Sequence, residues 1–146
     1  MMRYGLWAME RHAAELDRAG LLQDARVVEI VRHIMFARRL WLERVRDGVI
    51  TAVPDDIQSF DEAMARCVGD TAAWVAWLES VSDDGLNETV TFTSIEGEQH
   101  TQPLASIAMH VVNHTTHHAH ELGMILRSRG YRPPSTDYIV YARLHS

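Results

Sequence analysis

Apolar residues recur every three or four positions over most of the chain, which is the pattern of amphipathic helices. One such stretch covers roughly residues 2–18 and ends near Gly20, a second runs from about Asp24 to Arg46, and a third begins after Ser59. Pro54, Asp55 and Asp56 are expected to mark a loop between the last two. Ser59 and Glu62 form a capping-box pattern, in which each side chain binds a free backbone N–H of the first helical turn.

The period changes to two near residue 89, where Val90 and Phe92 alternate with threonines. A turn at Ile95-Glu96-Gly97 and a return strand predict a β-hairpin, which needs support from the helices because two strands alone are marginally stable. A fourth long helix is expected from about Pro103 to Arg129, with Gly130 as its stop, and a short final segment begins near Asp137. The pattern predicts one all-α domain over residues 1–146, a four-helix bundle with a small β-hairpin inserted before the last long helix.

Composition narrows the function classes. The 146 residues carry a formal charge of −6 and no basic stretch, so phosphate-driven binding to nucleic acid is not expected. No apolar run is long enough for a membrane span, and the start does not have the pattern of a signal peptide. The single cysteine, Cys67, lies in the apolar seam of the third helix, which favours an inert core thiol and a reducing, cytoplasmic location. Glu43 and Arg44 are expected on a solvated face.

The histidines carry the chemistry. There are nine, and five of them lie between His110 and His120. On a helical wheel, His114 and His118 fall inside or at the edge of the apolar face, whereas His110 and His117 lie on its flank. Two imidazoles at i, i+4 can chelate one metal ion. Two partly buried, hydrogen-bonded histidines would give the same pattern.

The second helix supplies a third candidate. His33 lies on its apolar arc, so that a helix with one inward histidine faces a helix with two. Three neutral imidazoles leave the full charge of the ion in place and leave coordination positions open, which suits catalysis. Zinc is the expected metal, and nickel, cobalt and iron are chemically admissible.

The sequence resembles the DinB/YfiT-like superfamily of bacterial four-helix-bundle metalloproteins over nearly its whole length. The resemblance is carried by the following stretches: Arg32-His33-Ile34, Asn113-His114-Thr115-Thr116-His117-His118, Arg129-Gly130-Tyr131-Arg132-Pro133-Pro134 and Asp137-Tyr138-Ile139-Val140-Tyr141. It implies one divalent metal ion held by His33, His114 and His118, and a cytoplasmic, often dimeric protein. It also implies a thiol-dependent transferase or isomerase, with a low-molecular-weight thiol as cosubstrate and a small-molecule substrate. This sequence departs from the family where Arg-Gly-Gln commonly follows the last histidine and Ala119-His120-Glu121 stands here.

Several further roles stay open at this stage. His110, Asn113, His117 and Tyr138 are candidates for groups around the metal, with solvent exposure or plain packing as the alternative for each. A hydrolase that uses metal-activated water, or a metal-dependent binding or stress-response protein without turnover, would fit the same three histidines. Met109, Val112 and Met124, on the far side of the fourth helix, hint at a homodimer.

Overall fold

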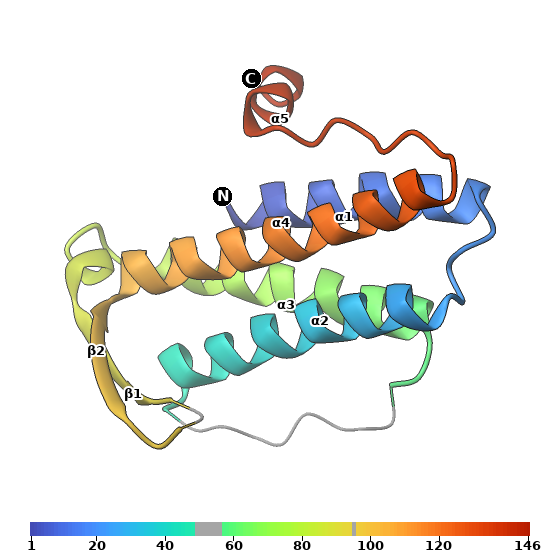
Figure 1. Ribbon diagram of the computed structural model, residues 1–146. Helices are drawn as coiled ribbons and strands as arrows, with labels where there is room; N and C mark the ends of the chain where they lie inside the picture. The colour runs from blue at the N-terminus through green and yellow to red at the C-terminus, as the bar shows by residue number, and fades with distance from the viewer. Residues whose placement is uncertain (49–56, 95) are drawn as a thin grey trace.

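The computed structural model describes residues 1–48, 57–94 and 96–146, and its chain is mostly helical (Figure 1). Five α-helices and a two-stranded antiparallel sheet form the described part, together with a short 3-10 helix, η1 (Gly85–Asn87). The elements are, in order, α1 (Met2–Arg18), α2 (Ala25–Arg46), α3 (Phe60–Ser80), β1 (Thr89–Thr93), β2 (Gln99–Pro103), α4 (Leu104–Ser128) and α5 (Tyr138–Leu144). The expected loop at Pro54, Asp55 and Asp56, and Ile95 of the expected turn, lie outside the described residues.

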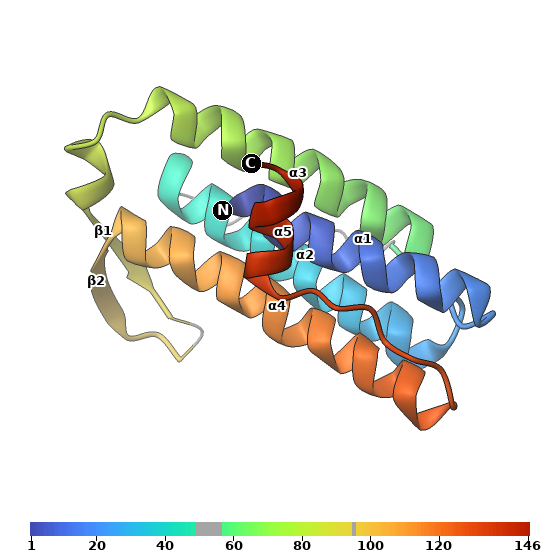
Figure 2. The same cartoon turned by 90° about the horizontal axis from the view of Figure 1, so that it is seen from above.

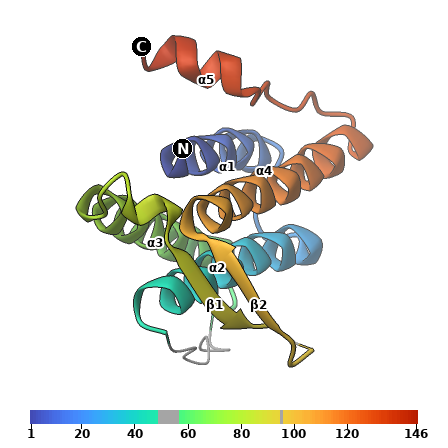
Figure 3. The ribbon, with the colours of Figure 1, turned by 90° about the vertical axis from the view of Figure 1, so that its left-hand side faces the viewer.

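The four long helices lie side by side (Figure 3). α1 packs against α4 and α3, and α2 packs against α3 and α4. Their apolar faces meet in two clusters, one built around Met9, Ile34 and Leu122 and the other around Leu42 and Trp74. Within the described residues, no helix combines the length and the apolar character that crossing a membrane requires.

The helix ends follow the predicted chemistry. Asp24 caps α2 by accepting hydrogen bonds from the backbone N–H groups of Arg26 and Val27. Ser59 and Glu62 form the expected capping box at the start of α3. α4 ends at Ser128, and Gly130 follows its C-cap with a φ of 84°, a left-handed conformation that a glycine adopts without a steric penalty.

The hairpin lies against α2 and the start of α4 (Figure 1). Phe92 of β1 meets the ring of Trp41 edge-on at 4.8 Å, and the guanidinium of Arg44 lies over the Trp41 ring. Arg44 also donates a hydrogen bond to the backbone oxygen of Thr93. The expectation that Arg44 belongs to a solvated face was therefore wrong, because its side chain holds the hairpin on α2.

Glu43 was also wrongly assigned to a solvated face, since its side chain is 7 % exposed. Arg39 explains the burial, because its guanidinium donates to Glu43 at 2.7 Å and to Asp70 of α3 at 3.0 Å.

A second arginine of α2, Arg38, is 1 % exposed. It donates to the hydroxyl of Thr115 on α4 and to the backbone oxygen of Met2 on α1. The bonds of Arg38 and Arg39 tie α2 to the other three long helices.

The chain returns over α1 after α4 (Figure 2). Tyr4 of α1 donates a hydrogen bond to the backbone oxygen of Thr136, and its ring meets that of Tyr138 edge-on at 5.1 Å. Tyr141 packs on both Tyr4 and Trp7. The final helix is thus held on the α1 side of the molecule by aromatic contacts.

Candidate metal centre

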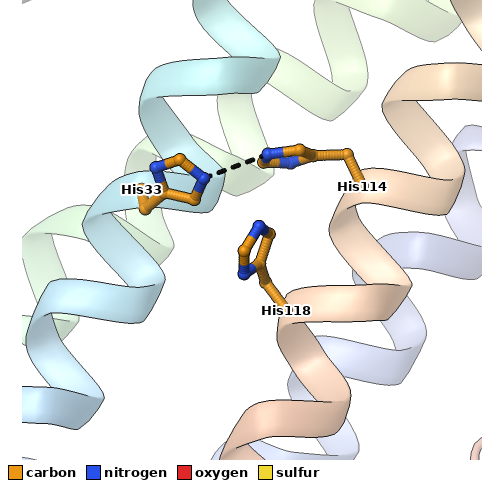
Figure 4. Close-up of side chains that lie close together, drawn as sticks. All are labelled: His33, His114 and His118. Carbon is orange, nitrogen blue, oxygen red and sulfur yellow. Dashed lines mark hydrogen bonds between the residues drawn. The ribbon is translucent and has the colours of Figure 1, made fainter.

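Three imidazoles from two helices meet in the groove between α2 and α4 (Figure 4). His33 comes from α2, and His114 and His118 lie one turn apart on α4, on the same helix face. The Nε2 atoms of His33 and His114 are 3.1 Å apart, and each ring centroid lies 4.5–4.9 Å from the other two. One candidate ligand nitrogen from each residue lies within 4.8 Å of those of the other two.

The centre lies nearer the surface than the helical wheel indicated. His33 is exposed, and His114 and His118 are half-buried. The apolar arc of α2 is wide. His33 lies at its edge, where the neighbouring helices do not cover the side chain. A groove of about 320 Å³ opens beside the rings, and it is lined by Arg26, Glu29, Ile30, His33, His118 and Glu121. Small molecules therefore have access to the centre.

Electrostatics keep two of these rings neutral. Burial is the largest cause that lowers the pKa of His114, to about 4, and the neighbouring His118 and His33 lower it further. The pKa of His33 is lowered too, first by burial and then by His118. Neutral imidazole is the form of histidine that binds metal ions, so both rings are ready to coordinate at neutral pH.

Glu121 fixes the third ring. The Nδ1 atom of His118 lies 2.7 Å from Oε1 of Glu121, and a carboxylate accepts, so Nδ1 carries the proton. In the neutral form of this ring the lone pair is on Nε2, which points toward the gap between His33 and His114 (Figure 4). Arg26 donates to the second oxygen of Glu121 at 3.1 Å and to Glu29 at 2.9 Å. Many metal-ligating histidines donate their second nitrogen to a carboxylate in this way.

Sequence reasoning missed this role of Glu121. The residue was noted only as part of the departure from Arg-Gly-Gln. Its spacing of three from His118 was the available signal, because residues at i and i+3 are neighbours on a helix surface. Glu121 also belongs to a second group with metal-ligand chemistry, formed with His117 and His118.

The other candidate residues lie around or away from the centre. The ring of His110 is 5.8 Å from that of His114 and 5.3 Å from that of Trp41, and His110 lines a separate apolar cavity beside the hairpin. The side chain of His117 is 75 % exposed, with its ring 5.0 Å from that of His118. Asn113 is exposed. Tyr138 contacts Tyr4 and Tyr141 on the α1 side, which is not the side of the three histidines.

These features define a helical protein with a surface cluster of three histidines between two long helices. The sequence model of the DinB family matches residues 10–145, so the chain belongs to the DinB family. A search of the curated proteins gave no match.

Proposed function

We propose that this protein binds one divalent metal ion through His33, His114 and His118, and that it transfers a low-molecular-weight thiol to a small electrophile. The observation that carries the proposal is the 3.1 Å approach of the Nε2 atoms of His33 and His114. Two nitrogens bound to one tetrahedral zinc ion at about 2.05 Å lie roughly 3.3 Å apart, so the rings need little movement to share an ion.

The donor set supports a cation. Without one, the contact between the two Nε2 atoms requires one of them to carry a proton. The Nδ1 atom of His114 is buried and has no hydrogen-bond partner in the described part of the chain. When Nδ1 carries the proton of the neutral ring, the lone pair of Nε2 faces the gap and can bind an ion. Membership of the DinB family and the grouping of the three side chains favour the same conclusion. Zinc is the first choice, followed by nickel, cobalt and iron.

A divalent ion held by His33, His114 and His118 would lower the pKa of a coordinating thiol from about 8.5 to below neutrality, which would supply thiolate at working pH. In the reaction, a bond forms between the thiol sulfur and an electrophilic carbon, the thiol proton passes to solvent, and the leaving group departs with its electron pair. The protein positions the reactants. Glu121 holds the ring of His118, and the groove of about 320 Å³ beside it accommodates a small thiol against Ile30 and the charged groups of Arg26 and Glu29.

The metal is tested first. Protein purified without an affinity tag is expected to contain about one divalent ion per chain by elemental analysis. His114→Ala should lose the ion and remain helical by circular dichroism. His117→Ala is the matched control, because this exposed neighbour belongs only to the second group with Glu121. Loss of the ion in His117→Ala but not in His114→Ala would overturn the proposed ligand set.

Turnover is tested separately with the metal-loaded protein. Glutathione, bacillithiol or mycothiol is mixed with a chloro-nitrobenzene, and conjugation above background is expected to disappear on adding a chelator. Hydrolysis of a test ester without any thiol would favour metal-activated water instead. Tight, reversible binding of small molecules with no reaction would favour a binding or stress-response protein.

We also propose that the four long helices form a single-domain four-helix bundle that works in the cytoplasm as a homodimer. Met109 and Met124 on the outer side of α4 are 42 % and 63 % exposed and are candidates for the dimer surface, whereas Val112 is buried in the protein's own core. Analytical ultracentrifugation of wild type and of Met124→Glu tests the dimer. The substitution should shift the equilibrium to monomer.

A further inference from the structure

A further cavity, of about 350 Å³, lies where α4 packs on α1, on a different side of α4 from the three histidines. The segment that leads from α4 back to α5 (Figure 2) contributes residues 132–137 to its lining. No residue that lines this cavity also lines the groove of the histidine centre. An inference about it is therefore independent of the proposed metal site, although Met124, a candidate for the dimer surface, also lines the cavity.

A buried histidine forms one wall of this cavity. His12 of α1 is 1 % exposed, and its Nδ1 atom lies 2.8 Å from the backbone oxygen of Ala8. A carbonyl oxygen only accepts, so Nδ1 carries the proton and Nε2 of the neutral ring is an acceptor. Burial lowers the pKa of His12, which keeps the ring neutral at neutral pH. Nε2 has no hydrogen-bond partner among the described residues.

Gly123 keeps this nitrogen accessible. A Cβ atom at position 123 would lie 3.0 Å from Nε2 of His12 and 3.3 Å from Cβ of Pro133, which is tighter than ordinary packing allows. Gly123, Pro133 and His12 all line the cavity, so the edge of the ring that carries Nε2 faces it. The cavity thus presents an unpartnered acceptor to which a ligand can donate an N–H or O–H group.

Two arginines give the cavity a positive charge. Arg127 and Arg132 line it, and neither has an ion pair or hydrogen bond to another described residue. Arg129, in contrast, pairs with Asp24 at 3.1 Å. The one carboxylate in the lining, Asp137, offsets a single guanidinium. A ligand with a carboxylate would complement the remaining charge, since guanidinium groups bind carboxylates in a planar, paired geometry.

We propose that this cavity binds a small carboxylic acid that also carries a hydroxyl or amino group. Its carboxylate is held by Arg127 and Arg132, and its hydroxyl or amino group donates a hydrogen bond to Nε2 of His12. The volume of about 350 Å³ lies at the lower end of the range for small-molecule sites.

The test compares L-malate with succinate, which differ by one hydroxyl group, in titrations followed by NMR of the backbone amides. L-malate is expected to shift the amides of Gly123, Arg132 and residues 135–137 in a saturable way. It is also expected to bind about tenfold more tightly than succinate, the effect of one added hydrogen bond. L-aspartate, titrated in parallel, shows whether the amino or the hydroxyl donor is preferred. Succinate that binds as tightly as both L-malate and L-aspartate, or no saturable shift with any of the three acids, overturns the proposal.

Substitutions locate the binding. Arg127→Gln and Arg132→Gln should each weaken L-malate binding at least about tenfold, which corresponds to the loss of one charged contact. Arg129→Gln is the matched control and should leave binding unchanged. His114→Ala should also leave L-malate binding unchanged. This control excludes binding in which the acid chelates an ion at the histidine centre. Binding that survives both arginine substitutions, or that vanishes in His114→Ala, contradicts the assignment.

Discussion

Glu121 accepts a hydrogen bond of 2.7 Å from Nδ1 of His118, and this contact sets which nitrogen of His118 faces the other two histidines. The carboxylate lies one turn further along α4 and is itself held by Arg26 of α2. Glu121 therefore orients His118, one of the three proposed metal ligands, without being a ligand of that ion itself.

Removal of this contact is expected to weaken metal binding. Glu121→Ala should lower the affinity for zinc by about 10–100-fold, the usual cost of losing a partner that orients a ligand. Glu121→Gln should have a smaller effect, because an amide oxygen still accepts from Nδ1. Competition with a chromophoric chelator measures both. Glu29→Gln is the control, since Glu29 contacts Arg26 but has no contact with His118 among the described residues, and its affinity should stay within about threefold of wild type.

Cys67 is expected to be chemically inert in the folded protein. The side chain is fully buried, and burial raises the pKa of its thiol to about 12. The thiolate, which is the reactive form, is therefore scarce at pH 8 in the folded protein. Labelling with a disulfide reagent should be slow in buffer and fast in denaturant. Fast labelling of the native protein would show that the thiol is accessible.

Thr115 is expected to matter for stability out of proportion to its size. Its hydroxyl accepts from the buried guanidinium of Arg38 and donates to the backbone oxygen of Val111. Thr115→Val keeps the shape but leaves a buried charged donor without its partner, which costs about 1–3 kcal/mol in the free energy of unfolding. Urea denaturation measures the change. Thr116→Val, which removes a hydroxyl bonded only to its own helix, should cost less than about 1 kcal/mol.

Acid is expected to destabilise the metal-free protein. The pKa values of His12, His33 and His114 are all lowered in the folded state, with burial as the largest cause. The unfolded chain therefore binds more protons between about pH 6.5 and pH 4, so stability is fully present above pH 6.5 and is lost as the pH falls through this range. The midpoint of thermal unfolding should be lower at pH 5 than at pH 7.5.

The contribution of His12 to the loss of stability in acid can be measured separately. His12→Gln retains a side chain that can donate to the backbone oxygen of Ala8 but cannot titrate, so the gap between the two unfolding midpoints should shrink. His100→Gln, at an exposed position on the hairpin, is the control and should leave the gap unchanged. A gap that does not change in His12→Gln would mean that His12 is not responsible for acid sensitivity.

The sequence pattern predicted the helices to within one or two residues, because periodic apolar positions and capping residues act locally. Ser59 and Gly130 are examples, since each acts on its own helix end. Contacts between helices were less accessible. The ion pair of Arg39 with Asp70 joins residues 31 positions apart, and no local pattern distinguishes Arg39 from a solvated arginine. The 3-10 turn at residues 85–87 was missed for lack of any periodic signal.

In the candidate site, too, local features were predicted from the sequence and contacts between elements were not. His114 and His118 were predicted to share a face because helical spacing alone determines it. The exposure of His33 was not predicted, since it depends on how far the neighbouring helices cover α2. The role of Glu121 depended on a rotamer that the sequence does not specify.

The distance along the chain between His33 and His114 has a mechanical consequence. The two rings come from segments 81 residues apart, and the single cysteine excludes an internal disulfide. An ion coordinated by both rings would close a large loop of the chain and restrict its unfolding, as a cross-link does. A bound ion would then slow the separation of α2 from α4. Slower amide hydrogen exchange in both helices of the metal-loaded protein would report this.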